Sequence, residues 1–433
     1  MALFCGAAAV AWSAEPAALE LADGWRVRVT VHPGQPAVEV DIPRSEETAA
    51  VDEKYEALPV FNPNAPGYAK GAQLRGVRAQ ETTTPGLLDP ASVVVRGGAG
   101  PDAAVLARGV DYQFDDAWGT LGRVEGGAIA AGQTVWISYR FTPMRLDSLV
   151  AAAGGKVELR QGEPRAAAPL PAPIKEGERL LGRVWQPGRL DRLDARHLFS
   201  ILETACPEPA KSTPSVAEAK LPRTMAKLRS GEPLRILAWG DSVTESVYLP
   251  NRETAAWQHQ FVARLQKRFP QARIELRTEG WGGRTTAAYL AEPAGSERNY
   301  QEKVLAVKPD LIVSEFVNDA GLPLEQVKTI YARLLADFQA QGAEWLILTP
   351  HYVRPDWMGL DRERDIDEDP RPYVAFLREF AHAQPVALAD AARRYGRLWR
   401  QGLPHVSLML NSINHPDERG MAIFADALME IFP

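Results

Sequence analysis

The sequence predicts two domains of different class, an all-β, sandwich-like domain followed by a doubly wound α/β domain with a five-stranded parallel sheet. The chain has 433 residues, which is more than a single ordinary hydrophobic core organises. Residues 20–205 contain short strands of alternating apolar and polar residues, separated by glycine and proline. Residues 232–433 instead alternate short apolar runs with segments of helical period.

The composition is that of a soluble globular protein without a nucleic-acid partner. Hydrophobic residues make up 45% of the chain and charged residues 24%, and both values are ordinary for this class. The formal net charge of -6 and the pI near 5.8 give no reason to expect binding to nucleic acid.

The first residues of the chain, 1–14, form an apolar run that ends in small residues, a pattern typical of a secretory signal peptide. The run is too short to span a bilayer as a helix, so no stable membrane insertion is expected. We therefore predict a secreted or periplasmic protein. Removal of the signal would take Cys5 with it and leave Cys206 unpaired, so we expect neither an internal disulfide nor a cysteine-rich metal site.

Within the β domain, period-two alternation is clearest at residues 25–31, 37–41 and 134–141. The absence of a convincing long helical repeat between these runs favours antiparallel sheets packed face to face. A polar, proline-bearing stretch then begins at Cys206 and leads into a short helical segment. We place a linker at 206–231 and the start of the second domain at residue 232.

The second domain alternates strand and helix in a regular way. Its predicted strands cover 234–239, 274–276, 311–313, 345–348 and 386–388, and its clearest helices cover 256–269, 324–341 and 372–382. This alternation predicts a parallel sheet covered by helices on both faces. Ligands of such sheets bind outside the carboxyl ends of the strands, so the residues at those ends are the candidates for function.

Four clusters of polar or glycine residues lie at these strand ends or in the nearby loops. Asp241 and Ser242 follow the first strand, and a glycine-rich turn occupies 279–286. The third cluster is 315–319 and the fourth is 414–417. An Asp-Ser pair after a strand is most often only a helix cap, so the first cluster alone does not identify a nucleophile.

Taken together and in this order, the clusters resemble the sequence blocks of the SGNH hydrolase superfamily, the GDSL-type esterases and lipases, over residues 234–433. Ser242 matches the nucleophile block, Gly283 the glycine block, Asn318 the asparagine block and His415 the histidine block. The resemblance implies a flavodoxin-like fold and a serine hydrolase that needs no cofactor and no metal. It also implies an oxyanion hole made by the backbone N–H groups of Ser242 and Gly283 and the side-chain amide of Asn318.

These roles suit the chemistry of ester hydrolysis. A serine hydroxyl is a poor nucleophile at neutral pH, so a base must take its proton, and His415 is the natural candidate. The negative charge that develops on the carbonyl oxygen needs preorganised hydrogen-bond donors, and losing one of them typically costs about 3 kcal/mol of transition-state stabilisation.

The histidine block departs from the family pattern. The family usually has an aspartate three residues before the histidine, where it orients the imidazole, and this chain has Ser412 at that position. Either a backbone carbonyl or Asn411 holds the ring of His415, or another carboxylate does so. Asp390, at the end of the fifth strand, is the best-placed substitute, although it also suits the cap of the next helix. Phe316 stands where the third block usually has glycine.

The loop after the fourth strand, 349–359, should overhang the site and is rich in polar aromatic residues. We predict a rim that stacks on a sugar ring while a small acyl group enters the oxyanion hole. The residues that we expect to face the substrate are Asp241, Trp281, Arg284, His351, Tyr352 and Trp357.

The sequence thus predicts a carbohydrate O-acyl esterase, with an acetylated oligo- or polysaccharide as its partner. One alternative is a general lipid or thioester hydrolase of the same family. Another is a carbohydrate-binding protein whose hydrolase domain is inactive, an interpretation that the serine at position 412 supports.

Overall fold

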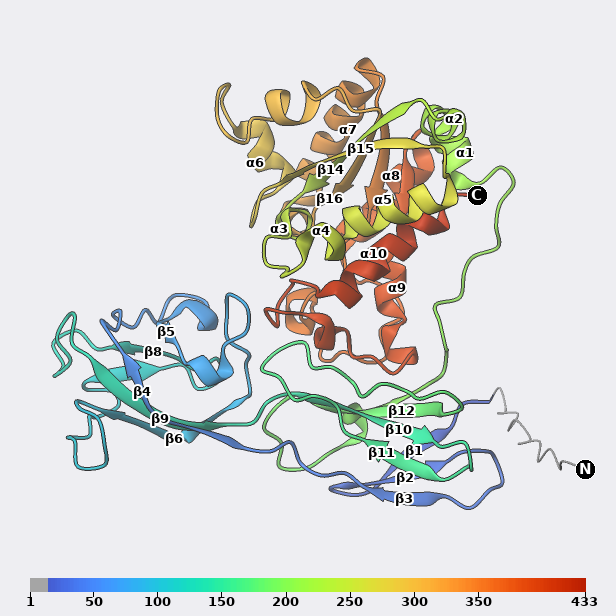
Figure 1. Cartoon of the computed structure of the whole chain (residues 1–433). Coiled ribbons are helices and arrows are strands. Elements are labelled where there is room, and N and C mark those ends of the chain that lie inside the picture. The colour runs from blue at the N-terminus through green and yellow to red at the C-terminus, as the bar shows by residue number, and fades with distance from the viewer. Residues whose placement is uncertain (1–14) are drawn as a thin grey trace, which may run out of the picture. The chain divides into compact units, whose positions relative to one another are not determined.

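The computed structural model describes residues 15–433 and divides them into two compact units (Figure 1). The β unit comprises the chain up to Ala205 together with the segment Trp399–Ile413. The α/β unit comprises Cys206–Leu398 and Asn414–Pro433. The predicted signal peptide, 1–14, lies outside the described residues.

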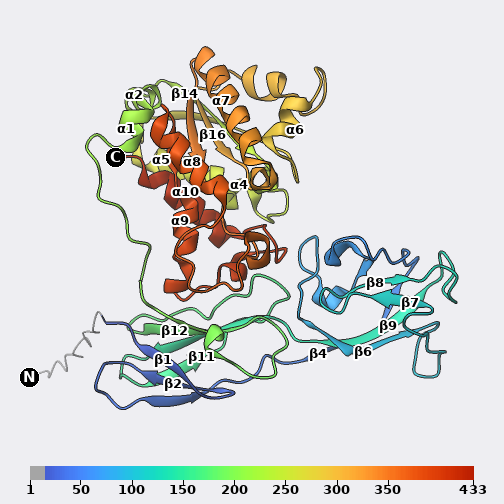
Figure 2. The same ribbon diagram turned by 180° about the vertical axis from the view of Figure 1, so that it is seen from behind.

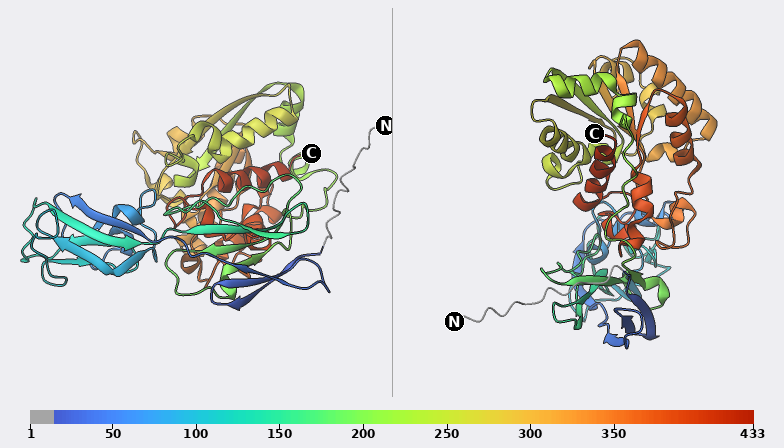
Figure 3. Two further views of the ribbon diagram at one scale, coloured as in Figure 1. Left: turned by 60° about the horizontal axis from the view of Figure 1, so that its bottom comes forward. Right: turned by 90° about the vertical axis from the view of Figure 1, so that its right-hand side faces the viewer.

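The β unit consists of antiparallel sheets, as the period-two alternation predicted (Figure 3). Their strand orders are β1-β2-β3, β11-β10-β12-β13, β4-β9-β6 and β5-β8-β7. The strands are β1 (Ala18–Asp23), β2 (Arg26–Thr30), β3 (Val38–Asp41), β4 (Thr48–Tyr55), β5 (Ala72–Gln73), β6 (Leu88–Arg96), β7 (Tyr112–Phe114), β8 (Thr120–Arg123), β9 (Val135–Phe141), β10 (Arg145–Ala151), β11 (Val157–Arg160), β12 (Arg179–Gln186) and β13 (Leu198–Ser200).

The β unit has two hydrophobic cores, one for each pair of sheets. Val29 of β2 packs in one core with Leu149 of β10, so the first two sheets face each other. Ile137 of β9 packs in the other core with Phe114 of β7, so the remaining two sheets also face each other. The prediction of face-to-face antiparallel sheets is therefore confirmed, but in two packed pairs where the sequence suggested one.

The α/β unit is built on a five-stranded parallel sheet of order β15-β14-β16-β17-β18, and all five predicted strands are present (Figure 2). The strands are β14 (Pro233–Gly240), β15 (Arg273–Gly280), β16 (Leu311–Glu315), β17 (Glu344–Leu348) and β18 (Ala387–Ala389). The strand order changes direction at β14, because the chain adds β15 on one side of β14 and β16 on the other. Ligands of open α/β sheets bind at such a switch point, outside the carboxyl ends of the strands.

Helices cover both faces of this sheet. Helices α5 and α10 pack together on one face, and α7 and α8 pack together on the other (Figures 1 and 2). The helices are α1 (Val216–Lys220), α2 (Pro222–Ser230), α3 (Ser242–Glu245), α4 (Arg252–Ala255), α5 (Trp257–Arg268), α6 (Thr286–Ala291), α7 (Leu324–Ala340), α8 (Pro372–Ala383), α9 (Ala391–Gly396) and α10 (Glu418–Glu430). Within residues 15–433, no helix is long and apolar enough to cross a membrane.

The stretch 206–231, predicted as a linker, contains α1 and α2 and belongs to the α/β unit. Ser215 caps α1 reciprocally with Glu218, since each side chain accepts a hydrogen bond from the other residue's backbone N–H. Met225 and Leu228 of α2 are buried. The stretch is therefore part of the folded unit, and it leads directly into β14.

Candidate active site

The candidate nucleophile lies on a tight turn between β14 and α3. Ser242 is the first residue of α3, and Asp241 before it is the N-cap, whose Oδ1 accepts a hydrogen bond of 3.1 Å from the backbone N–H of Val243. The apolar strand and the capped helix thus hold the Ser242 side chain at the carboxyl edge of the sheet. This edge is next to the topological switch point, where a ligand is expected.

Two glycines allow this turn to lie directly on the strand ends. A Cβ atom on Gly240 would come within 2.2 Å of both the carbonyl oxygen of Glu315 and the hydroxyl of Thr244. A Cβ atom on Gly280 would come within 2.4 Å of the backbone nitrogen of Glu245. Both distances are far below contact distance, so any larger residue would displace the turn that carries the candidate nucleophile.

The candidate base lies within hydrogen-bond distance of the candidate nucleophile. Nε2 of His415 is 3.1 Å from Oγ of Ser242. His415 precedes α10 and is buried, with 5% of its surface exposed. A neutral imidazole nitrogen at this distance is able to accept the serine proton.

Two aromatic rings of the α/β unit hold the histidine segment. Tyr248, in the loop after α3, stacks on His415 with ring centroids 4.1 Å apart and planes inclined by 4°. Nε2 of His351 lies 2.8 Å from the carbonyl oxygen of Asn414. Because a carbonyl oxygen only accepts, this nitrogen carries the proton and donates to the residue directly before His415.

The glycine-rich turn follows β15 and lies beside the candidate nucleophile. The backbone N–H of Arg284 donates to the carbonyl of Trp281, and Gly283 between them has φ of +70°. This conformation suits glycine at the third position of a type II turn. A Cβ atom on Gly282 would be 3.7 Å from Cβ of Ser242. The turn therefore brings its backbone N–H groups close to the predicted oxyanion position.

Asn318 follows β16 and is held by Asp241. Its backbone N–H and its Nδ2 donate to Oδ2 of Asp241 at 3.1 and 3.0 Å. Nδ2 also donates to the carbonyl of Arg284 at 3.3 Å. Asp241, which the sequence placed among the substrate-facing residues, has 0% of its surface exposed. The structure therefore places it beneath the site, where it connects the nucleophile turn to the asparagine block.

Three buried carboxyl groups lie under the site. Burial, reinforced by nearby Asp319, raises the pKa of Asp241 to about 7. Burial and the negative charge of Asp241 raise the pKa of Glu315, the last residue of β16, well above its ordinary value. Burial raises the pKa of Asp319 to about 6, although it accepts hydrogen bonds from the backbone and hydroxyl of Thr286. The low polarity of their buried surroundings thus favours the protonated form of all three carboxyl groups.

The residues considered as partners for the imidazole have other contacts in the structure. Asn411 groups with the β unit, where its Nδ2 donates to Glu81 and its Oδ1 accepts from the backbone of Ile413. Asp390 caps α9 through the backbone N–H of Arg393 and pairs with Arg378 at 2.9 Å. Asp390 thus serves as a helix cap and as the partner of Arg378.

The predicted rim residues divide into exposed and buried ones. Trp281 is partly exposed and lies under the guanidinium of Arg284, at 5.2 Å from the ring centroid. Trp357, on the short helix Pro355–Met358, has 52% of its surface exposed. His351 and Tyr352 are buried, at 0% and 1% exposure. The structure therefore places only three of these five side chains where they could meet a ligand.

Phe316, which replaces the usual glycine, packs inside the unit. Its ring meets that of Trp239 edge to face at 4.8 Å, and that of Tyr289 at 6.1 Å. The larger side chain fills an aromatic cluster at the end of the sheet.

Tyr248 was not identified from the sequence, and Glu315 lay in the third cluster without a predicted role. A tyrosine six residues after the serine matches no motif, because its stacking on His415 depends on the loop conformation after α3. The signal for a role of Glu315 is that a charged residue ends an otherwise apolar strand. Among the described residues, no group of three His, Cys, Asp or Glu side chains is arranged to hold a metal ion.

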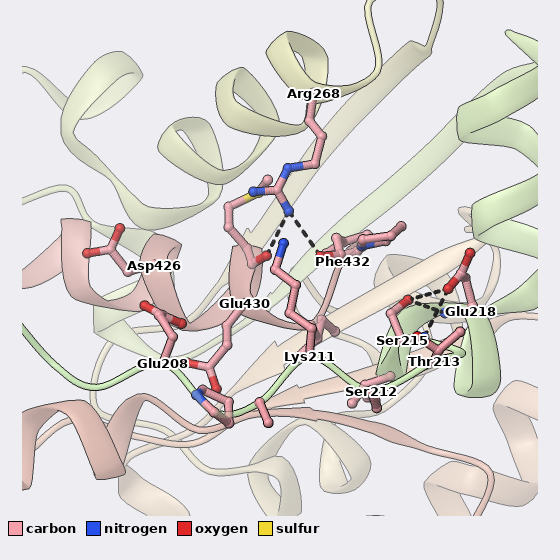
Figure 4. Close-up of a pocket in the computed structure, with 16 residues that line it drawn as sticks. Glu208, Lys211, Ser212, Thr213, Ser215, Glu218, Arg268, Asp426, Glu430 and Phe432 are labelled. Carbon is pink, nitrogen blue, oxygen red and sulfur yellow. Dashed lines mark hydrogen bonds between the residues drawn. The ribbon is translucent and has the colours of Figure 1, made fainter.

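A separate cavity of the α/β unit lies away from these residues (Figure 4). It has a volume of about 580 Å³ and is lined by the chain before α1, by Arg268 of α5 and by the end of α10. Arg268 donates to the carbonyls of Met429 and Phe432, so its charge is used in fastening the C-terminal helix. None of the candidate catalytic residues lines this cavity.

Residues 238–423 match the GDSL-like Lipase/Acylhydrolase family. A search of curated protein sequences finds no match.

Several solved structures are similar to part of this chain at low sequence identity. A two-domain esterase, CEX, active on acetylated mannans, is 18% identical with a TM-score of 0.39; the match covers 49% of this chain and 51% of that one. This chain thus spans about half the length of that esterase. An acetylxylan esterase, Axe2, from Geobacillus stearothermophilus is 18% identical with a TM-score of 0.38, over 46% of this chain and 93% of that one. A member of the lipolytic G-D-S-L family from Veillonella parvula DSM 2008 is 18% identical with a TM-score of 0.34, over 46% and 98%.

The matched region contains the nucleophile turn, the glycine-rich turn, the asparagine block and the histidine block. It also covers the five parallel strands from Ala238 of β14 onward. Residues 238–423 therefore form a domain of the GDSL-like lipase/acylhydrolase family.

Proposed function

We propose that the protein is a serine esterase that hydrolyses small O-acyl groups, chiefly O-acetyl groups, from a carbohydrate. The observation that carries the proposal is the 3.1 Å separation between Oγ of Ser242 and Nε2 of His415 at the carboxyl edge of a parallel sheet. A nucleophile and a base in direct contact, next to a glycine turn, form the arrangement that acyl transfer requires.

In the proposed reaction, His415 takes the proton of Ser242 while Oγ attacks the ester carbonyl carbon. The carbonyl oxygen becomes an oxyanion, which accepts hydrogen bonds from the backbone N–H groups of Ser242 and Gly283 and from Nδ2 of Asn318. His415 then gives the proton to the departing sugar oxygen, leaving an acyl-serine. A water molecule, deprotonated by the same imidazole, hydrolyses the acyl-serine and releases the acid and the free enzyme.

The contacts of Asn318 suit it to this role. Its Nδ2 has two hydrogens, one directed to Asp241 at 3.0 Å and the other to the carbonyl of Arg284 at 3.3 Å. The second bond is long and therefore weak. We infer that the oxyanion competes for this hydrogen, while the bond to Asp241 keeps the amide in place.

The surroundings of the glycine-rich turn favour a polar substrate. Arg284 is exposed and stacks on Trp281, which presents a charged and aromatic surface next to the turn. Aromatic faces bordered by hydrogen-bond donors suit sugar rings. A polysaccharide outside the cell would be a substrate consistent with the export that the sequence of residues 1–14 predicts.

A second candidate function is the hydrolysis of longer acyl esters or thioesters. It is favoured by two exposed apolar side chains of the α/β unit, Val247 with 66% and Trp357 with 52% of their surfaces exposed. Val247 precedes Tyr248, whose ring contacts His415, so an apolar acyl chain could pass this residue on its way to the site.

The test compares nitrophenyl esters of acetate, butyrate and octanoate, together with acetate release from acetylated xylan and mannan oligosaccharides. The wild type is measured beside Ser242→Ala and the matched control Ser230→Ala, a serine at the end of α2. We expect kcat on acetate esters to fall about 10³-fold or more in Ser242→Ala and to stay unchanged in the control. Faster turnover of octanoate than of acetate would favour the second candidate.

Other outcomes would contradict the proposal directly. A wild type that binds acetylated glycans but turns over none of these esters would indicate a carbohydrate-binding protein with an inactive hydrolase domain. Equal kcat in the wild type and Ser242→Ala would overturn the nucleophile assignment.

A further inference from the structure

A carboxylate of the helix that carries the candidate nucleophile is bound to the glycine-rich turn. Glu245 is the last residue of α3, the helix that begins with Ser242. Its Oε2 accepts a hydrogen bond of 2.9 Å from the backbone N–H of Gly282. The side chain of Glu245 therefore connects the two segments that the proposed reaction uses, one for the attack and one for the oxyanion.

The helix and the turn also lie against each other at this point. A Cβ atom on Gly280 would come within 2.5 Å of Cα and 2.6 Å of Cβ of Glu245. A Cβ atom on Gly282 would lie 3.0 Å from Oε2 of Glu245 and 3.7 Å from Cβ of Ser242. The carboxylate thus closes a contact that the absence of side chains on both glycines makes possible.

The hydrogen bonds of the turn flank the proposed oxyanion donor. The N–H of Gly282 donates to Glu245, as described. The N–H of Arg284 donates to the carbonyl of Trp281 at 3.2 Å. The N–H groups on both sides of Gly283 are thus engaged, and the N–H of Gly283 itself is the one that the proposed reaction uses. The orientation of this group depends on how firmly its neighbours are held.

A guanidinium group ties the carboxylate to the strand from which the turn emerges. Nη2 of Arg298 donates to Oε1 of Glu245 at 3.4 Å, and Nη1 donates to Oε1 of Glu279, in β15, at 3.1 Å. Glu279 also accepts a hydrogen bond of 3.2 Å from the hydroxyl of Tyr289. The side chains of Glu245 and Arg298 are each only 24% exposed, so solvent weakens their ion pair less than it would a fully exposed one.

We propose that Glu245 is a positioning residue, which fixes the glycine-rich turn so that the N–H of Gly283 is directed to the oxyanion. Two successive glycines give the backbone of this turn unusual freedom, which would let the donor adopt other orientations. An oxyanion hole is effective because its donors are in place before the reaction begins. The bond from Gly282 to Glu245 supplies that restraint. This proposal rests on the proposed function, because it concerns one donor of the proposed oxyanion hole.

The variant Glu245→Ala removes the carboxylate and leaves the donor present but less well placed. We expect kcat on nitrophenyl acetate to fall about tenfold with KM unchanged, since small misplacements of catalytic groups reduce rates strongly. The matched control is Glu275→Ala, which removes another carboxylate of the same unit that pairs with two arginines, Arg235 and Arg277. It should keep the wild-type kcat.

Two more variants separate positioning from general destabilisation. Glu245→Gln keeps a side-chain oxygen that is able to accept from Gly282 and should retain most of the wild-type kcat. Arg298→Met leaves the carboxylate but removes the cation that holds it, so kcat should fall, though less than in Glu245→Ala. If Glu245→Ala does not fold, Arg298→Met decides the question.

Inhibition by a phenylboronic acid gives a readout that does not depend on turnover. The boron atom binds the serine oxygen and forms a negatively charged tetrahedral adduct, which resembles the state that the oxyanion donors stabilise. The inhibition constant of Glu245→Ala should therefore rise by about the factor by which kcat falls. In Glu275→Ala it should stay at the wild-type value.

The outcomes are distinct. Wild-type kcat and wild-type boronic acid inhibition in Glu245→Ala, with an active wild type, would overturn this proposal and leave the esterase assignment intact. Equal losses of kcat in Glu245→Gln and Glu245→Ala would also overturn it, because the hydrogen bond to Gly282 would then not be what matters. An inactive wild type would overturn the proposed function, and this proposal with it.

Discussion

Tyr248 lies flat against His415, with 4.1 Å between the ring centroids and 4° between the planes. Burial raises the pKa of Tyr248 well above its ordinary value, so the tyrosine stays neutral at any useful assay pH. Its electron-rich face attracts a positively charged ring, as in other cation–π pairs. The imidazole becomes charged when it takes the serine proton, so the stack should stabilise that state more than the resting one.

We expect Tyr248→Leu to lower kcat on acetate esters about tenfold, in line with the 0.5–2 kcal/mol typical of cation–π contacts. Tyr248→Phe keeps the ring and should remain within about twofold of the wild type. Steady-state kinetics check both variants. If Phe and Leu reduce kcat equally, the hydroxyl and not the ring face is what matters at this position.

Asp241→Asn tests the link between the nucleophile turn and the asparagine block. An amide at this position has one oxygen, whereas the structure shows two donors of Asn318 and one of Val243 converging on the carboxyl group. The amide of Asn318 should therefore move, and loss of one oxyanion donor costs about 10²-fold or more in kcat. We expect that loss with little change in KM. Asn318→Ala should show a loss of similar size, and near wild-type kcat in Asp241→Asn would contradict the assigned role.

Asp390→Asn distinguishes a helix cap from a partner of the imidazole. In the structure Asp390 accepts from the backbone of Arg393 and from the guanidinium of Arg378. We therefore expect the variant to lower the unfolding free energy by about 1 kcal/mol and to leave kcat nearly unchanged. Thermal unfolding and kinetics on the same sample decide the question. A large loss of kcat with unchanged stability would instead identify Asp390 as the missing carboxylate.

The buried carboxyl groups predict that stability falls as pH rises. Asp241 and Asp319, with pKa values raised to about 7 and about 6, bind protons more tightly in the folded protein than in the unfolded chain. Burial and the charge of Asp241 also raise the pKa of Glu315, so this group acts in the same direction. Between about pH 4 and these raised values the folded state therefore holds more protons, so the free energy of unfolding decreases with rising pH.

Urea denaturation between pH 5 and pH 8 measures this slope, and each acid that titrates in the range contributes about 1.4 kcal/mol per pH unit. Glu315→Gln removes one of the acids and should flatten the dependence. The matched control is Glu297→Gln, a change at an exposed carboxylate, which should leave the slope as in the wild type. A wild-type stability that rises over this range would contradict the raised pKa values.

The fold of the α/β unit was predictable from the sequence because its signals are local. Each strand is a short apolar run and each long helix carries an apolar stripe, so burial on both faces of the sheet follows from the pattern. The order of the four sequence blocks also placed Ser242, Gly283, Asn318 and His415 at one edge of the sheet. Their catalytic roles remain predictions, which the substitutions above test.

The parts that the sequence did not predict depend on contacts distant in the chain. His351 and Tyr352 belong to a proline-bounded loop whose sequence predicts exposed side chains, yet both side chains are buried. The hydrogen bond from His351 to the carbonyl of Asn414 holds this part of the loop in the interior. The return of Trp399–Ile413 to the β unit also left no local signal, because Val406 is one apolar residue among many. The β unit packs its sheets in two pairs, each around its own core, and this arrangement could not be predicted from the alternation of apolar and polar residues. Alternation shows which side chains share a face of a strand, but it does not show which strands or sheets lie next to that face.

The glycines at the ends of β14 and β15 restrict how this protein could change during evolution. A Cβ atom at Gly240 or Gly280 would lie only 2.2 to 2.4 Å from its nearest neighbouring atom. Even alanine at either position would therefore move the serine. Adaptation to a new ester must therefore occur in the loops that surround the serine, where residues such as Val247 and Trp357 are exposed and free of this constraint. A library that varies those loops while retaining both glycines is the natural starting point for altering substrate preference.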